Sequence, residues 1–137
     1  SSDFFEVIKE ENLSFSSYDF DYGEYVKYKN EDGNYTGAES TDLYWKEKGG
    51  EYSSDSVFRV HIFRFPQGVT VADCAPGYEQ YNEAGTYIKQ ANNNKTAYVV
   101  LINNLYFCRF VIRNDCADYD TIVSQLMSFC LSLNNYV

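Results

Sequence analysis

Four arginines and one histidine are the side chains of this sequence best suited to bind a ligand. All four arginines lie in two strand-like segments, residues 56–65 and 105–113, whereas the seven lysines lie elsewhere. The guanidinium group is a planar fork of donors that suits carboxylate and phosphate groups and also stacks on aromatic rings. If both segments share a sheet, one face of it combines cations with aromatic rings. The members of this predicted ligand-binding face are Arg59, His61, Phe63, Phe107, Arg109 and Arg113.

This composition suits a small anionic or sugar-like ligand, or a partner protein. The arginines also have a structural explanation, in which they pair with the protein's own acidic groups while the aromatic rings lie buried beneath residues 12–54. The fourteen tyrosines, seven of them in the N-terminal half, suggest a second binding surface, although tyrosine equally suits half-buried sheets. The sequence leaves these alternatives open.

Catalytic motifs do not single out an active site. The sequence contains no G-x-S-x-G, H-E-x-x-H, Walker or dinucleotide-binding pattern, and His61 is its only histidine. We therefore predict no catalytic residue and no cofactor, and expect a non-enzymatic binding or interaction module. One alternative is a small enzyme that uses His61 with an acidic residue. Another is a secreted inhibitor or effector that blocks a target protein.

The four cysteines form no C-x-x-C pair, so their spacing does not indicate a zinc site. Cys108 lies about 16 Å from its strand end and Cys130 about 18 Å from its helix start, which places them at similar height in adjacent elements. We predict a Cys108–Cys130 disulfide and, by elimination, Cys74–Cys116, as in an exported protein. Buried reduced thiols are the alternative. The acidic run at 19–24 lacks the EF-hand spacing, and we predict no metal site.

The net charge is −9 and the isoelectric point is about 4.4. This charge argues against binding to nucleic acid or to an anionic membrane surface. No segment approaches the roughly 20 apolar residues of a membrane span. The sequence begins at Ser1 without a methionine, so we expect a removed leader and an extracellular or cell-surface location.

The hydrophobic pattern predicts one α+β domain over residues 1–137. It would contain an antiparallel sheet of five or six strands, with N-terminal and C-terminal helices packed mainly on one face. The expected helices are 3–11 and 117–133, and residues 69–84 carry a short helix or irregular turn with Cys74. One apolar stripe of the helix 117–133 consists of Ile122, Leu126, Phe129, Cys130 and Leu133. The expected strands are 24–29, 42–48, 56–65, 86–90, 96–102 and 105–113.

The last two strands form a hairpin around Asn103-Asn104, because asparagine tolerates the positive φ of a tight turn. With Ile102 opposite Leu105, one face of the hairpin carries no charge and receives the C-terminal helix. The other face carries the arginines. The predicted helix-facing residues are Ala97, Val99, Leu101, Tyr106, Cys108, Phe110 and Ile112.

Overall fold

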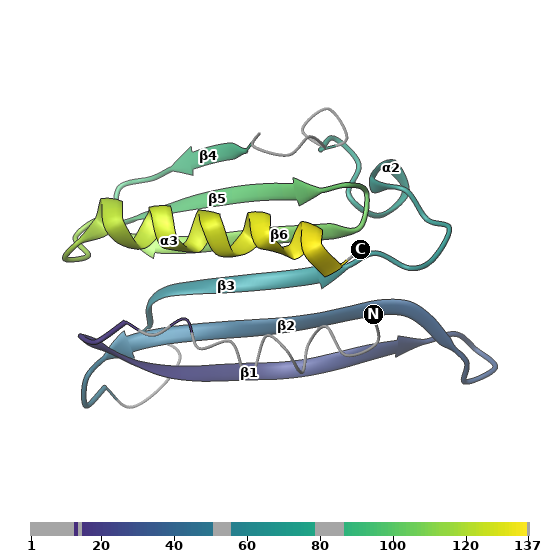
Figure 1. Ribbon diagram of the computed structural model, residues 1–137, viewed down its shortest axis with the longest axis horizontal. Helices are drawn as coiled ribbons and strands as arrows, with labels where there is room; N and C mark the ends of the chain where they lie inside the picture. The colour runs from purple at the N-terminus through teal and green to yellow at the C-terminus, as the bar shows by residue number, and fades with distance from the viewer. Residues whose placement is uncertain (1–12, 14, 51–55, 79–86, 137) are drawn as a thin grey trace.

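The protein folds around a single six-stranded antiparallel sheet (Figure 1). The computed structural model describes residues 13, 15–50, 56–78 and 87–136. The strands are β1 (Tyr18–Lys29), β2 (Tyr35–Glu47), β3 (Ser56–Arg64), β4 (Ile88–Ala91), β5 (Lys95–Ile102) and β6 (Tyr106–Arg113), in the spatial order β1-β2-β3-β6-β5-β4. The helices are α2 (Val71–Cys74) and α3 (Tyr119–Ser132), and a 3₁₀ turn, η3 (Leu133–Tyr136), follows α3.

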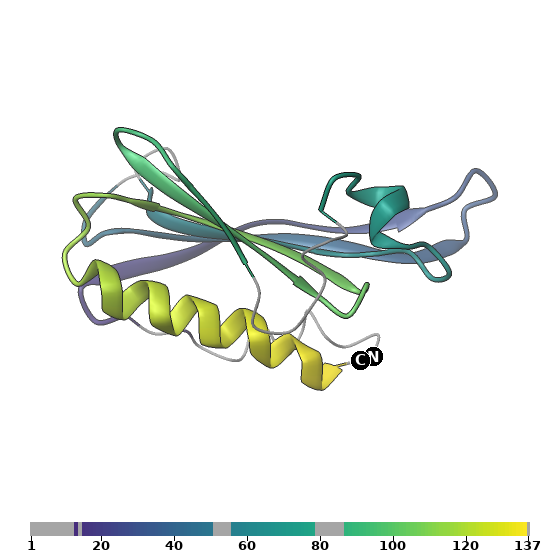
Figure 2. The ribbon, with the colours of Figure 1, turned by 90° about the horizontal axis from the view of Figure 1, so that it is seen from above.

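The two faces of the sheet are covered very differently (Figure 2). Helix α3 lies along one face, which we call the helix face. The short α2 lies on the opposite side, near one end of the sheet, and we call that side the open face. In the described part of the chain, the open face is therefore covered by α2 near one end only.

The expected α+β architecture with a helix at each end is wrong. The described chain is mostly antiparallel sheet with one long helix near its C-terminus, and the predicted helix 3–11 lies outside the described residues. The N-terminal hairpin is also much longer than expected, with strands of 12 and 13 residues. A register shift between Tyr22 and Tyr25 interrupts the β1–β2 ladder within β1.

The core lies between α3 and the helix face. The predicted apolar stripe of the C-terminal helix is confirmed, because its members are buried in that core. They are Ile122, Leu126, Phe129, Cys130 and Leu133. Trp45 of β2 extends the core and stacks on Phe58 of β3, with ring centroids 5.1 Å apart. Aromatic pairs of this kind add to the stability gained from burial alone.

Tyr18 at the start of β1 connects the sheet edge to the start of α3. Its hydroxyl lies 3.3 Å from the Cys116 thiol and donates to the Ala117 carbonyl at 3.3 Å. Burial, followed by the hydrogen bond with Cys116, raises the pKa of Tyr18 to about 12. The phenol therefore stays neutral at physiological pH and can act as a donor.

The β5–β6 hairpin turns at Asn103-Asn104 as predicted, but its register differs from the prediction. Both asparagines have positive φ, 49° and 56°, and the Leu105 amide donates to the Ile102 carbonyl at 2.8 Å. Leu105 is an extra loop residue, so Ile102 pairs with Tyr106 rather than with Leu105. The Leu105 carbonyl accepts a hydrogen bond from the Phe65 amide at 2.7 Å, and this bond holds Leu105 outside the β5–β6 ladder.

One residue of shift moves every side chain of a strand to the other face. The predicted faces of β3 and β6 hold, but those of β5 are inverted. Tyr98, Val100 and Ile102 join the core beneath α3, and Ala97, Val99 and Leu101 lie on the side of Arg109. The sequence pattern did not reveal this, because β5 is apolar on both faces.

Packing of α3 on the sheet predicts a clear difference between two neighbouring helix positions. Leu126 is fully buried, and truncation to alanine leaves a cavity in the core. We expect Leu126→Ala to lower the free energy of unfolding by about 2–5 kcal/mol. Gln125→Ala, at an exposed position, should change it by less than about 0.5 kcal/mol. Urea denaturation of both variants tests this, and equal effects would contradict the assigned helix orientation.

Candidate functional site

Alternation along β3 and β6 places all six predicted ligand-binding residues on the open face, with Arg113 at the end of β6 opposite Lys95. The pairing of β3 with β6 places His61 opposite Arg109, Phe63 opposite Phe107, and Arg59 opposite Val111. Because alternate residues share a face, these pairs form successive rows that run from a cationic end to an aromatic end. That these residues contact a ligand stays a prediction, but they do share one surface.

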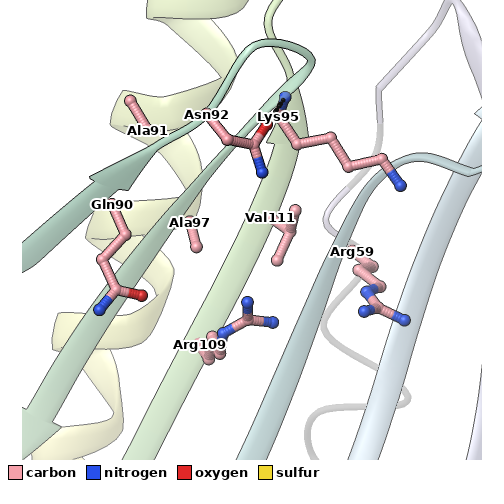
Figure 3. A pocket seen from close by; sticks show the side chains of 8 residues that line it. All are labelled: Arg59, Gln90, Ala91, Asn92, Lys95, Ala97, Arg109 and Val111. Carbon is pink, nitrogen blue, oxygen red and sulfur yellow. Dashed lines mark hydrogen bonds between the residues drawn. The ribbon is translucent and has the colours of Figure 1, made fainter.

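The cationic end contains a pocket of about 300 Å³ (Figure 3). Its lining comes from four strands and the β4–β5 turn, and consists of Arg59, Gln90, Ala91, Asn92, Lys95, Ala97, Arg109 and Val111. Ala97 and Val111 are cross-strand partners with short side chains. Between the longer side chains around them they form the floor of the pocket, with α3 behind the sheet.

The charge of this pocket is uncompensated. None of its lining residues is acidic. Within the described part of the chain, the side chains of Arg59, Lys95 and Arg109 make no hydrogen bond or ion pair. Arg59 and Arg109 are diagonal neighbours on adjacent strands, a position that separates their backbones by roughly 7–8 Å. Both guanidinium groups can therefore reach one small anion.

Two amides add neutral donors at the same pocket. The Asn92 Oδ1 accepts the backbone N–H groups of Asn94 and Lys95 at 3.0 and 2.7 Å. This bonding fixes the orientation of the amide and leaves its Nδ2 group available (Figure 3). Gln90 of β4 lines the same pocket with a second amide (Figure 3). Gln90, Asn92 and Lys95 were not among the predicted ligand-binding residues, since only the pairing of β4 with β5 brings them to the arginines.

The other two arginines have partners within the chain. Arg113 was predicted to bind ligand, but its Nη2 donates to Glu47 at 3.1 Å and its Nε lies 3.4 Å from an Asp115 carboxylate oxygen. Arg64 also has an interaction of its own, and its backbone lies opposite the buried Glu39 in the β2–β3 ladder. Pairing with the protein's own acidic groups therefore holds for Arg113, whereas Arg59 and Arg109 stay unpaired in the described chain.

The aromatic end contains a second pocket, of about 420 Å³. It lies between the sheet and the α2 segment, where Tyr78 packs edge-on against Phe107 with ring centroids 5.6 Å apart. Its lining is mostly apolar and consists of His61, Phe63, Phe65, Cys74, Ala75, Pro76, Tyr78 and Phe107. The predicted short helix with Cys74 is present as α2, where Asp73 accepts from the Thr70 amide and hydroxyl and so holds the first turn.

His61 lies where the two pockets meet. Its Nδ1 is 2.8 Å from Asp42 Oδ1, contributed by the paired strand β2. In the tautomer whose Nδ1–H donates to Asp42, Nε2 keeps a lone pair and can accept a proton or a hydrogen bond. The Cys74 thiol lines the same pocket, but burial, followed by the charge of Asp73, raises its pKa. Cys74 is therefore held as the neutral thiol, a poor nucleophile.

All four cysteines are free thiols, and none is at disulfide distance from another. The predicted neighbours Cys108 and Cys130 do meet in the core as thiols. The hydrogen bond with Cys130, together with burial, raises the pKa of Cys108 well above its usual range. Cys74 is the last residue of α2, and Cys116 lies just before α3. Helix α2 and the start of α3 lie at opposite ends of the molecule (Figures 1 and 2), so the pairing of Cys74 with Cys116 by elimination does not hold in this structure.

Neither a metal cluster, a membrane-spanning helix nor a related protein helps to assign a function to the described chain. Among the described residues, no cluster of three or more His, Cys, Asp or Glu side chains could hold a metal ion. No helix in the described ranges is both long and apolar enough to span a membrane. No protein-family model, curated protein or solved structure matches the chain. The functional argument therefore rests on the geometry of the open face.

The environments of the cysteines predict their reactivity. In reduced native protein at neutral pH, iodoacetamide should modify Cys74 first, because it is exposed whereas the other three thiols are buried. Intact-mass spectrometry should show one fast addition in native protein and four after unfolding. The Cys74→Ser variant should lose the fast addition. Modification of Cys108 or Cys130 at the rate of Cys74 would contradict the core assignment, and two missing additions in unreduced, unfolded protein would reveal a Cys108–Cys130 disulfide.

Proposed function

We propose that this domain is a binding module whose open face captures a small anionic ligand between Arg59, Arg109 and Lys95. The observation that carries the proposal is the cluster of three cations, unpaired within the described chain, around a floor of short side chains. The ligand would supply a carboxylate, phosphate or sulfate group. Guanidinium groups bind such groups through paired charge-assisted hydrogen bonds, about twice as strong as neutral ones.

The negative net charge of the protein favours small anions that enter the pocket over anions that bind at long range. With 20 acidic and 11 basic residues, the long-range field repels anions, so capture depends on short-range contacts inside the pocket. The two guanidinium groups, the Lys95 ammonium and the Asn92 amide provide such contacts. At 0.15 M salt, exposed charges are screened beyond about 8 Å. The proposal therefore favours a ligand that enters the pocket over an extended polyanion.

A double arginine variant tests the proposal. Isothermal titration calorimetry at low ionic strength would measure binding of sodium phosphate, sulfate and acetate to the wild-type protein and to Arg59→Gln/Arg109→Gln. We expect at least tenfold weaker binding by the variant for any anion that binds the wild type, because removal of two charge-assisted contacts costs about 1.5–3 kcal/mol each.

Arg113→Gln is the control, since it removes one arginine charge from the end of β6, and the single variants Arg59→Gln and Arg109→Gln are its charge-matched counterparts. Arg113 is engaged by Glu47 and Asp115, so Arg113→Gln should keep anion affinity within about twofold. Its stability should fall by no more than about 1 kcal/mol, as for an exposed ion pair. Equal loss of binding in Arg113→Gln and in its counterparts, or no anion binding by the wild type, would overturn the proposed function.

The His61–Asp42 contact at 2.8 Å favours a second candidate, a hydrolytic enzyme in which His61 acts as general base on a water molecule. Asp42 would hold the imidazole tautomer that exposes Nε2. If so, the wild type should hydrolyse p-nitrophenyl acetate faster than buffer, and both His61→Gln and Asp42→Asn should remove most of that rate. A wild-type rate equal to that of buffer would exclude this candidate for activated esters.

A further inference from the structure

We infer that the ligand of the open face is an amphipathic anion, with its charged group among Arg59, Arg109 and Lys95 and its apolar body in the aromatic pocket. This inference rests on the proposed function and specifies the class of ligand. It follows from two pockets of opposite chemistry that occupy adjoining rows of one sheet face.

The register of β3 and β6 places the two pockets next to each other. Arg109 lines the cationic pocket, whereas its direct cross-strand partner His61 lines the aromatic one. Phe107 is two residues from Arg109 on the same face, a separation of roughly 7 Å, and Phe63 is four residues from Arg59, roughly 13 Å. A ligand about 7–13 Å long would therefore reach both ends.

The aromatic pocket has the size and lining of a small-molecule site. Its volume of about 420 Å³ lies within the roughly 300–1,000 Å³ of typical ligand pockets. Phe63, Ala75, Tyr78 and Phe107 are only partly buried, so the chain's own packing leaves apolar surface there. Burial of that surface against an apolar ligand is favourable at about 25 cal/mol per Å².

The polar groups of the open face are distributed in the way an amphipathic anion requires. The Asp42 carboxylate beside the junction is engaged by His61 at 2.8 Å. This hydrogen bond occupies one Asp42 oxygen, and the remaining ring nitrogen of His61 can donate to an anion when the imidazole is protonated. No residue that lines the aromatic pocket is charged apart from His61 when protonated. The cationic pocket then receives the anion and the aromatic pocket its uncharged body.

A series of straight-chain carboxylates tests this inference by calorimetry below their micelle concentrations. Acetate reports the cationic pocket alone, whereas butanoate, hexanoate, octanoate and decanoate extend towards the aromatic pocket. We expect affinity to rise roughly twofold to fourfold per methylene. It should then level off once the chain fills the aromatic pocket.

Two variants, one that adds side-chain volume to the aromatic pocket and one that removes it, test whether this pocket causes the gain in affinity with chain length. Ala75→Leu fills the aromatic pocket, and Phe107→Ala removes one of its walls. Each should weaken octanoate about tenfold and leave acetate unchanged. Circular dichroism and thermal unfolding identify any variant that fails to fold, and the other variant then provides the test.

The outcomes separate this inference from the proposed function. Octanoate that binds no more tightly than acetate, or a gain that survives in Ala75→Leu and Phe107→Ala, overturns the amphipathic ligand while anion binding stands. Octanoate affinity that is unchanged in Arg59→Gln/Arg109→Gln overturns both. A gain that is lost in the pocket variants, together with overall binding lost in the arginine variant, supports both.

Discussion

The tight turn at Asn103-Asn104, with Leu105 held as one extra loop residue, is the constraint on which the open face depends. It pairs Ile102 with Tyr106 and so decides which half of β5 faces α3. With Ile102 opposite Leu105 instead, Tyr98 would lie opposite Arg109 on the open face. In the observed register Tyr98 stacks on Phe110 in the core, with ring centroids 4.9 Å apart, and Ala97 lies under the cations. The observed register therefore places Val99, and not the large ring of Tyr98, opposite Arg109 beside the pocket.

The distribution of charge across the sheet follows from the same geometry. On the helix face, the buried Glu39 lies between Lys27 and Arg64 on the two neighbouring strands, with Lys27 Nζ 3.9 Å from its carboxylate. Cations flank this acidic group because a buried charge without a partner costs several kcal/mol. Arg59 and Lys95 are exposed, so water solvates them and no acidic partner is needed. Cations without an acidic partner in the described chain can form charge-assisted hydrogen bonds with an anion, which is why the open face suits an anionic ligand better than the helix face.

Much of this arrangement could be predicted from residue order, and the rest could not for identifiable reasons. Alternation in 56–65 and 105–113 correctly placed Arg59, His61 and Arg109 on one side, and the apolar stripe of the C-terminal helix correctly identified its buried face. The predicted register of β5 was wrong because every residue from Ala97 to Ile102 is apolar or aromatic. No charged residue in this range indicates which side of the strand faces water. Gln90, Lys95 and Asp42 join the site through strand pairing, which local spacing does not report. Arg113 resembles Arg109 in sequence, and its contacts with Glu47, 66 positions away, and with Asp115 distinguish the two.

The central claim is that Arg59 and Arg109 are free to bind an anion whereas Arg113 is already engaged. The most direct measurement is an NMR titration of the arginine Nε–Hε resonances of ¹⁵N-labelled protein with octanoate, assigned with single Arg→Gln variants. The account predicts saturable shifts of the Arg59 and Arg109 signals with a common dissociation constant, and an unchanged Arg113 signal. Shifts of equal size at Arg113, or no saturable shift at Arg59 and Arg109, would contradict it.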